Sequence, residues 1–400
     1  MSEASPAAPI NWNLLQTRLL LGGGAGVALC ALGALLDPTQ FFRSWLFAFV
    51  FWLAFPLGGL VILMIQHQTG GRWGLMLRRP LEAAAMTLPV LAAAFVPVAF
   101  GVYHLYRWAD LDALPSAERT VLAHKQGYLN VPFFLIRSAV YFAVWIGVAW
   151  RLQRWSDELD RHYDKAIARR MQIISGPGLV LYGLTITFAA IDWIMSLEPH
   201  WYSSIFGAMI AGAQLLPAFA AGIIALVWLS SRPPVAGAMT PTLWGDLGNL
   251  LLAFVMIWAY LTFSQFLLIW SGNLKEEIPW YLNRITGGWE VLGWGLILFY
   301  FAMPFAVLLS RNFKRDPYRL VWVAGAVVVM HLVYVYWLIA PAFGGHGPGS
   351  RPHFSIHWLD AAALLAIGGV WLAAFLWRLQ QRPLLPLTDP ALHEAEAHHG

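Results

Sequence analysis

Ten stretches of this chain are apolar over lengths that can cross a lipid bilayer. A transmembrane helix needs about 20 consecutive apolar residues, because the hydrocarbon core is about 30 Å thick and a helix rises about 1.5 Å per residue. Only 12% of the 400 residues are charged, against about 25% in a soluble domain. The sequence therefore predicts an all-α integral membrane protein. Its ten expected helices cover 17–36, 43–65, 82–103, 129–151, 171–195, 201–229, 243–270, 286–310, 318–341 and 355–378.

These helices define the domain organisation. A polar N-terminal segment covers 1–16, a single ten-helix transmembrane domain covers 17–378, and a polar tail covers 379–400. Ten spans place both termini on the same side of the membrane. Lys and Arg are more than twice as frequent on that side as on the other, so the positive-inside rule predicts that both termini are cytoplasmic. We expect the charged segment 151–170 to be helical. We expect the tail from residue 384 to be solvated rather than to bind a metal through its histidines, His393, His398 and His399.

Several ionisable side chains lie inside the expected spans or at their edges, where hydrocarbon cannot solvate them. Each is costly there unless it is paired or reaches water, so residues of this kind mark candidate functional sites. They are Arg137, Asp192, Asp246, Glu290, His331 and Asp360.

One arginine and three acids of this set share the outer half of the membrane. Arg137 lies roughly 12 Å inside the outer end of its helix, at 1.5 Å per residue. Asp360 is expected just over one turn inside its helix, and Asp192 and Glu290 within a turn of the outer end of theirs. Because an unpaired buried charge is hard to tolerate, we expect Arg137 to pair with an acid, first of all with Asp192. Such a pair can be a structural ion pair or a member of a proton path, and the sequence favours neither role over the other.

The most distinctive segment is IDWIMSLEPHWYSSIFG, residues 191–207, a tight outer turn between two helices. Pro199 cannot continue a helix, and Glu198 and His200 flank it. A carboxylate beside an imidazole can relay protons near neutral pH. This turn is therefore either a proton relay or a capped turn anchored by its aromatic residues.

His331 is the histidine closest to the expected bilayer midplane, and Tyr334 follows one turn further along the same helix face. Histidine and tyrosine suit a proton path or a quinone pocket, because a quinol needs groups that take its protons. The alternative is a histidine bonded to a backbone carbonyl. On the cytoplasmic side, Glu82 and Asp246 open helices, where acids favour the helix dipole, although Asp246 can also admit protons. Gln265 can carry water between the two halves or hold helices together.

Several chemistries are excluded by what the sequence lacks. The single cysteine, Cys30, rules out an internal disulfide, a cysteine zinc site or an iron–sulfur cluster. A bis-histidine haem b needs two deep histidines on facing helices, and only His331 is deep. No phosphate-binding loop is present, and the basic residues lie in short loops, so neither ATP hydrolysis nor nucleic-acid binding is expected. We therefore predict no cofactor bound within the chain.

Two segments resemble a known family. The segment 191–207 and the segment 287–312, which begins GGWE and ends LLSRN, resemble the F subunit of bacterial alternative complex III. That subunit belongs to the NrfD-like (polysulfide-reductase-type) membrane proteins of a quinol:cytochrome c oxidoreductase. Asp192, Glu198, His200 and Glu290 stand in these matching motifs, whereas Arg137, Asp246, His331, Tyr334 and Asp360 are chosen on physical grounds alone.

The resemblance implies two four-helix bundles plus two extra helices, in the bacterial inner membrane. It implies partners: a sister NrfD-like C subunit, an iron–sulfur protein and cytochrome c subunits that hold the haem c and iron–sulfur clusters, with lipids, quinol and a terminal oxidase as further candidates. The expected role is a proton-conducting path and structural support in electron transport. The alternatives are a direct quinone-binding subunit, a scaffold without chemistry, and a stand-alone secondary transporter.

Overall fold

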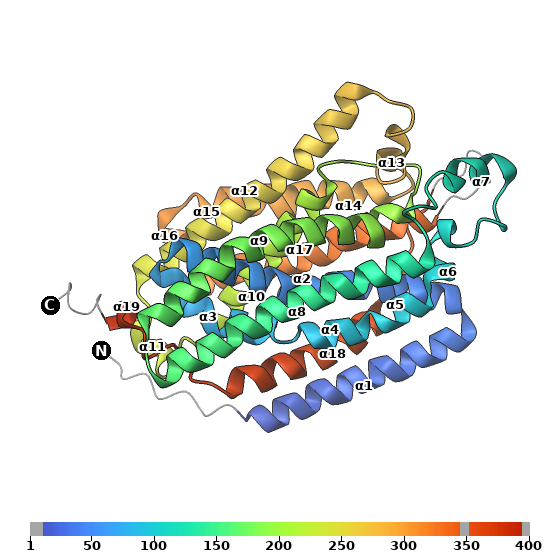
Figure 1. The fold of residues 1–400 in the computed structure, drawn as a ribbon. Coiled ribbons are helices and arrows are strands. Elements are labelled where there is room, and N and C mark those ends of the chain that lie inside the picture. The colour runs from blue at the N-terminus through green and yellow to red at the C-terminus, as the bar shows by residue number, and fades with distance from the viewer. Residues whose placement is uncertain (1–10, 345–351, 394–400) are drawn as a thin grey trace.

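The computed structural model describes residues 11–344 and 352–393, and these residues form an all-helical fold (Figure 1). The chain is 81% helical, without a strand among the described residues. Ten helices are long and apolar enough to cross a membrane. The predicted fold class is therefore confirmed.

Six spans are single helices: α1 (Trp12–Leu36), α2 (Pro38–Thr69), α8 (Val131–Arg161), α10 (Phe206–Leu229), α12 (Pro241–Gly272) and α18 (Trp358–Gln380). Two spans end in a short 3-10 turn, α9 (Lys165–Trp193) with η2 (Met195–Leu197) and α17 (Pro317–Ile339) with η4 (Ala340–Phe343). The third span consists of α3 (Arg72–Ala85), α4 (Leu88–Ala94) and α5 (Val96–Phe100), and the eighth of α14 (Trp289–Gly295), the π-helix η3 (Leu296–Ala302) and α15 (Met303–Leu308). The connections carry the short helices α6 (Val102–Leu105), η1 (Arg107–Ala109), α7 (Ser116–Ala123), α11 (Val235–Ala238), α13 (Ile278–Leu282) and α16 (Arg311–Lys314), and the tail carries α19 (Pro390–His393).

The third span differs most from the prediction. It begins at Arg72 rather than near residue 82, so that Glu82 lies well inside α3 instead of opening a helix. Pro89 and Pro97 lie in the first turns of α4 and α5, where a missing backbone N–H costs nothing. A proline cannot continue the helix that precedes it, so the span is divided at both prolines.

The spans pack as two four-helix groups. The first group consists of α2, α3–α5, α8 and α9, and the second of α10, α12, η3–α15 and α17, each closed by contacts between successive members. The two groups meet where α10 packs against α2 and α9. The remaining helices, α1 and α18, pack against each other along one edge of the molecule (Figure 1).

Glycine allows α1 and α18 to approach closely. A Cβ on Gly26 would lie 2.5 Å from the backbone nitrogen of Ala366, and a Cβ on Gly369 would lie 2.5 Å from the backbone of Gly23. Because lipid offers no hydrophobic gain for helix association, small residues that permit such contact stabilise the pair.

The beginning of α1 and the helix α19 lie at one end of the molecule, and the loops that carry α7 and α13 lie at the other, which we call the outer end (Figure 1). The segment 151–170 is helical, as predicted, except near the junction of α8 and α9. The tail differs from the prediction, because Leu385 and Leu392 are buried, so residues 384–393 are docked rather than solvated. His398 and His399 lie outside the described residues.

Candidate functional site

Arg137 and Asp192 form a bidentate ion pair inside the first bundle, as the sequence predicts. The Arg137 Nε and Nη2 atoms donate to the two Asp192 oxygens at 2.8 and 2.7 Å. The Tyr141 hydroxyl donates to the same carboxylate at 2.7 Å, and the Tyr128 ring lies 3.9 Å from the guanidinium. Asp192 is completely buried. Both charges are therefore neutralised in place, which suits a structural ion pair better than a proton carrier.

The outer turn does not bring Glu198 and His200 together. The Glu198 carboxylate accepts a hydrogen bond from Arg284 at 2.6 Å and one from Asn283 at 3.3 Å. His200 is half exposed and lies 3.3 Å from Glu118 instead. The two residues therefore face different outer loops, and a direct relay between them is not part of this arrangement.

Arg284 is a buried charge that sequence reasoning did not identify. Its guanidinium is 1% exposed, stacks 3.8 Å from the Trp280 ring and donates to the Leu338 carbonyl at 2.8 Å. It lies in a polar loop rather than in an apolar span, so hydropathy did not distinguish it. Its pairing with Glu198 fixes the outer turn against the end of α17.

Glu290 and Asp360 both lie in the first turn of a helix. Glu290 accepts from the Gly288 backbone N–H at 2.9 Å, at the start of α14. Asp360 accepts from the His357 N–H at 2.9 Å in a capping box. The predicted depth of Asp360 was wrong, because α18 begins at Trp358. Capping stabilises both helices by satisfying amides that have no partner within the helix.

Asp360 also faces a cavity of about 190 Å³ at the outer end. Its carboxylate accepts from the Ser44 hydroxyl at 2.5 Å and from the Tyr336 hydroxyl at 3.2 Å. Aromatic side chains and a guanidinium complete the walls. The residues that give the cavity this character are Arg43, Phe47, Trp289, Tyr336, Phe343 and Asp360.

His331 lies in the interior between the two bundles, 2% exposed. Its ring stacks on Phe51 with centroids 5.5 Å apart, and its Nδ1 lies 3.5 Å from the Tyr300 hydroxyl. Tyr334 shares its face of α17, as predicted, with ring centroids 6.5 Å apart. The alternative of a bond to a backbone carbonyl is not what the structure has, since the Nε2 atom lacks a hydrogen-bond partner among the described residues.

Polar side chains continue from Tyr334 toward the outer end along one face of α12. Trp258 and Thr262 are polar neighbours of the Tyr334 hydroxyl, and Gln265 follows one turn later, because residues three apart share a helix face. Gln265 is buried and accepts from the Ser203 hydroxyl at 2.5 Å. We call the residues Trp258, Thr262, Gln265, His331 and Tyr334 the polar ladder. It leads from the interior to the outer turn.

Asp246 lies apart from all of these groups, exposed near the beginning of α12 at the opposite end of the molecule. Glu82 lies at that end too. It was predicted to cap the start of a helix, but it is instead the centre of a buried network. It pairs with Arg78 at 3.0 Å, Arg79 at 2.7 Å and Arg382 at 2.9 Å, and it accepts from Ser156 at 2.5 Å.

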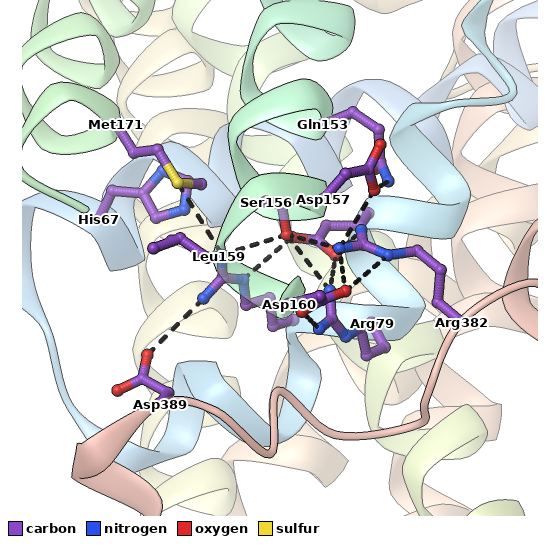
Figure 2. A network of polar contacts seen from close by, with 12 residues as sticks. His67, Arg79, Gln153, Ser156, Asp157, Leu159, Asp160, Met171, Arg382 and Asp389 are labelled. Atoms are coloured by element: carbon purple, nitrogen blue, oxygen red, sulfur yellow. Dashed lines mark hydrogen bonds and ion pairs between the residues drawn. The ribbon is translucent and has the colours of Figure 1, made fainter. Parts of the chain in front are cut away.

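Figure 2 shows how this network joins α3, α8 and the tail. Arg382 also pairs with Asp157 at 3.2 Å and with Asp160, and Asp389 reaches Arg78 at 3.7 Å. The spacing of Arg78, Arg79 and Glu82 by three and four residues is a sequence signal for local pairing. No such signal connects them to Arg382, which is 300 residues from Glu82. The network fixes the tail to the helices.

The nine predicted site residues therefore lie in separate places. The structure unites Arg137 with Asp192 and His331 with Tyr334. Within the described part of the chain, no group of three His, Cys, Asp or Glu side chains is placed to hold a metal ion. No protein-family model matches this chain, and no curated protein is similar to it.

Proposed function

We propose that this chain is an integral membrane subunit of a quinol-oxidising electron-transport complex, in which the second bundle provides the outer half of a proton path. The observation that carries the proposal is the polar ladder, a set of buried or partly buried polar side chains on α12 and α17 that includes a buried histidine and whose outer member, Gln265, bonds Ser203 of the outer turn. The motifs at 191–207 and 287–312 support the assignment to the NrfD-like family. The excess of basic residues at the other end supports cytoplasmic termini in a bacterial inner membrane.

Each residue of the ladder has a chemical role in this proposal. His331 can bind and release a proton at a nitrogen, and the Tyr334 hydroxyl can both donate and accept a hydrogen bond. Thr262 and Gln265 orient water toward Ser203, where the outer turn reaches solvent. Glu198, held by Arg284, is the acid nearest to this exit in the sequence. The electron carriers, haem c and iron–sulfur clusters, belong to partner subunits.

The other candidate residues stand outside this path. Arg137 and Asp192 hold the first bundle together as an ion pair, and Glu290 caps α14. His200 and its partner Glu118 lie on the outer loops, where they suit contacts with the iron–sulfur and cytochrome c partners. Asp246 is placed to collect protons at the cytoplasmic end.

The test replaces His331 by phenylalanine, which retains the aromatic packing against Phe51 and cannot bind a proton. The purified complex is reconstituted in vesicles, and electron transfer and proton release are measured together. We expect electron transfer to persist and the number of protons released per electron to fall. His124→Phe is the matched control, because the same substitution removes an exposed histidine of an outer loop that lies outside the ladder. An unchanged proton stoichiometry in an assembled His331→Phe complex would contradict the proposal.

The cavity at Asp360 supports a second candidate function, direct binding of quinol. An apolar cavity of about 150 Å³ can hold benzene, so a cavity of about 190 Å³ has room for one six-membered ring. Oxidation of a quinol releases two protons and two electrons. Asp360 is placed to accept one proton, the other passes to solvent at the outer end, and an electron carrier in a partner subunit must take both electrons. The test is to label the complex with a photo-reactive quinone. Labelling of this chain at the cavity supports quinol binding here, and labelling of a sister subunit alone contradicts it.

A further inference from the structure

Four buried polar atoms at the inner end of the polar ladder form no hydrogen bond of good distance and angle among the described residues, although Trp258 and Thr262 lie next to the Tyr334 hydroxyl. They are Trp258 Nε1, Thr262 Oγ1, His331 Nε2 and the Tyr334 hydroxyl, and all four atoms are buried. Trp258 of α12 packs edge-on against Tyr334 of α17 with ring centroids 5.5 Å apart, and His331 and Tyr334, both on α17, have centroids 6.5 Å apart. These four side chains therefore form one cluster and are not isolated from one another.

Single buried atoms without a partner occur elsewhere among the described residues, such as the indole Nε1 atoms of Trp108, Trp201 and Trp289, whereas this cluster brings four together. In the first bundle, the buried indoles of Trp145 and Trp193 donate to the hydroxyls of Thr185 at 2.8 Å and Ser138 at 3.0 Å. Likewise, the buried Tyr182 hydroxyl donates to Gln214 at 2.9 Å. Buried polar groups in proteins nearly always have a partner, from the protein or from ordered water.

The backbone near the cluster has an unusual geometry. The eighth span changes to a π-helix over Leu296–Ala302, which carries Tyr300. Tyr300 is fully buried, packs 4.3 Å from Trp258 and places its hydroxyl near Nδ1 of His331. Short π-helical segments in membrane and soluble helices frequently occur at functional sites. Because Tyr300 occupies the Nδ1 side, the Nε2 atom remains available to another partner.

We propose that the space between α12, η3 and α17 binds ordered water, held by Trp258, Thr262, His331 and Tyr334. The donor and acceptor types are complementary to water: the indole only donates, the two hydroxyls donate or accept, and one imidazole nitrogen accepts. A buried water typically makes two to four hydrogen bonds, which this cluster supplies. The use of this water for proton transfer rests on the proposed function, whereas its presence does not.

The first test uses the sign of a stability change. If the Tyr334 hydroxyl is dry and unpaired, Tyr334→Phe removes a desolvated polar group and raises the melting temperature. If water binds the Tyr334 hydroxyl, or if that hydroxyl bonds Trp258 and Thr262 directly, the variant loses hydrogen bonds and the melting temperature falls; the second test separates these two cases. Tyr182→Phe is the matched control, because the same substitution removes a hydroxyl with a direct partner. We expect both variants to melt below the unmodified protein, and a Tyr334→Phe variant that melts at or above it would overturn the proposal.

The second test locates the water directly. Hydroxyl radicals generated by X-rays inside the full complex oxidise side chains next to bound water, however deeply they are buried. We expect Trp258 and Tyr334 to be modified faster than Trp145 and Tyr182, which are equally buried in the first bundle. Equal, slow modification of all four would remove the water site. Fast modification together with an unchanged proton stoichiometry in His331→Phe would retain the water and reject the proton path.

Discussion

Replacing Asp192 by leucine leaves the Arg137 guanidinium in the first bundle without the carboxylate that it now contacts at 2.7 and 2.8 Å. The Tyr141 hydroxyl loses its acceptor in the same step. Removing one member of a buried ion pair costs about 3–5 kcal/mol, because the remaining charge stays desolvated. A protein domain is stable by only about 5–15 kcal/mol. Asp192→Leu is therefore expected to remove a large part of the stability of this chain.

A double-variant cycle separates the pair from the loss of side-chain volume. Arg137→Leu alone is expected to be similarly harmful, since it leaves a fully buried carboxylate. The variant with both substitutions is expected to be less destabilised than either single variant, because replacing a buried ion pair by apolar side chains is often neutral. Thermal unfolding of the purified protein measures all three.

The control is an exposed ion pair. Arg119 and Asp112 lie 3.6 Å apart in an outer loop, with side chains 46% and 97% exposed. Pairs of this kind contribute about 0–1 kcal/mol, so Asp112→Asn is expected to leave the melting temperature almost unchanged. If Asp192→Leu is as mild as Asp112→Asn, or if the effects of Asp192→Leu and Arg137→Leu simply add, the reasoning about the buried pair is wrong.

Two further changes test other parts of the fold. Arg382→Gln removes the cation that holds the tail to Glu82, so limited proteolysis is expected to cleave residues 381–393 faster than in the unmodified protein; equal cleavage rates would show that the ion pairs do not hold the tail. Gly26→Leu adds atoms where a Cβ alone would lie 2.5 Å from the Ala366 backbone. Overpacking of this kind typically costs about 1–3 kcal/mol, so the melting temperature is expected to fall. The control is Ala25→Leu on the exposed face of α1, which is expected to have little effect on the melting temperature.

The ten spans were predictable because apolar length alone determines which segments cross a bilayer. The third span shows where that reasoning fails. Arg78, Arg79 and Glu82 lower the hydropathy of its first half, and the predicted helix therefore began too late. Glu82 pairs with both arginines, and Asp160 of α8 and Asp389 of the distant tail supply the further negative charge that Arg79 and Arg78 need. Hydropathy measures each residue alone and contains no information about such partners.

The candidate site was predictable to a similar extent. The Arg137–Asp192 pair followed from the cost of an unpaired charge in hydrocarbon, which leaves few acceptable arrangements. Arg284 was missed because it lies in a loop, where an arginine is ordinary. The polar ladder was predicted only in its members His331, Tyr334 and Gln265, since its continuity depends on how α12 packs against α17.

The close packing of α1 against α18 has a consequence for how the chain is made. Eight other spans separate α1 from α18 in the chain, so the surface that receives Gly23 and Gly26 is synthesised long after α1 itself. Until then, α1 must wait in the lipid or beside the insertion machinery, with its glycine face uncovered. Membrane assembly must therefore bring together two helices whose synthesis is separated by that of eight other spans.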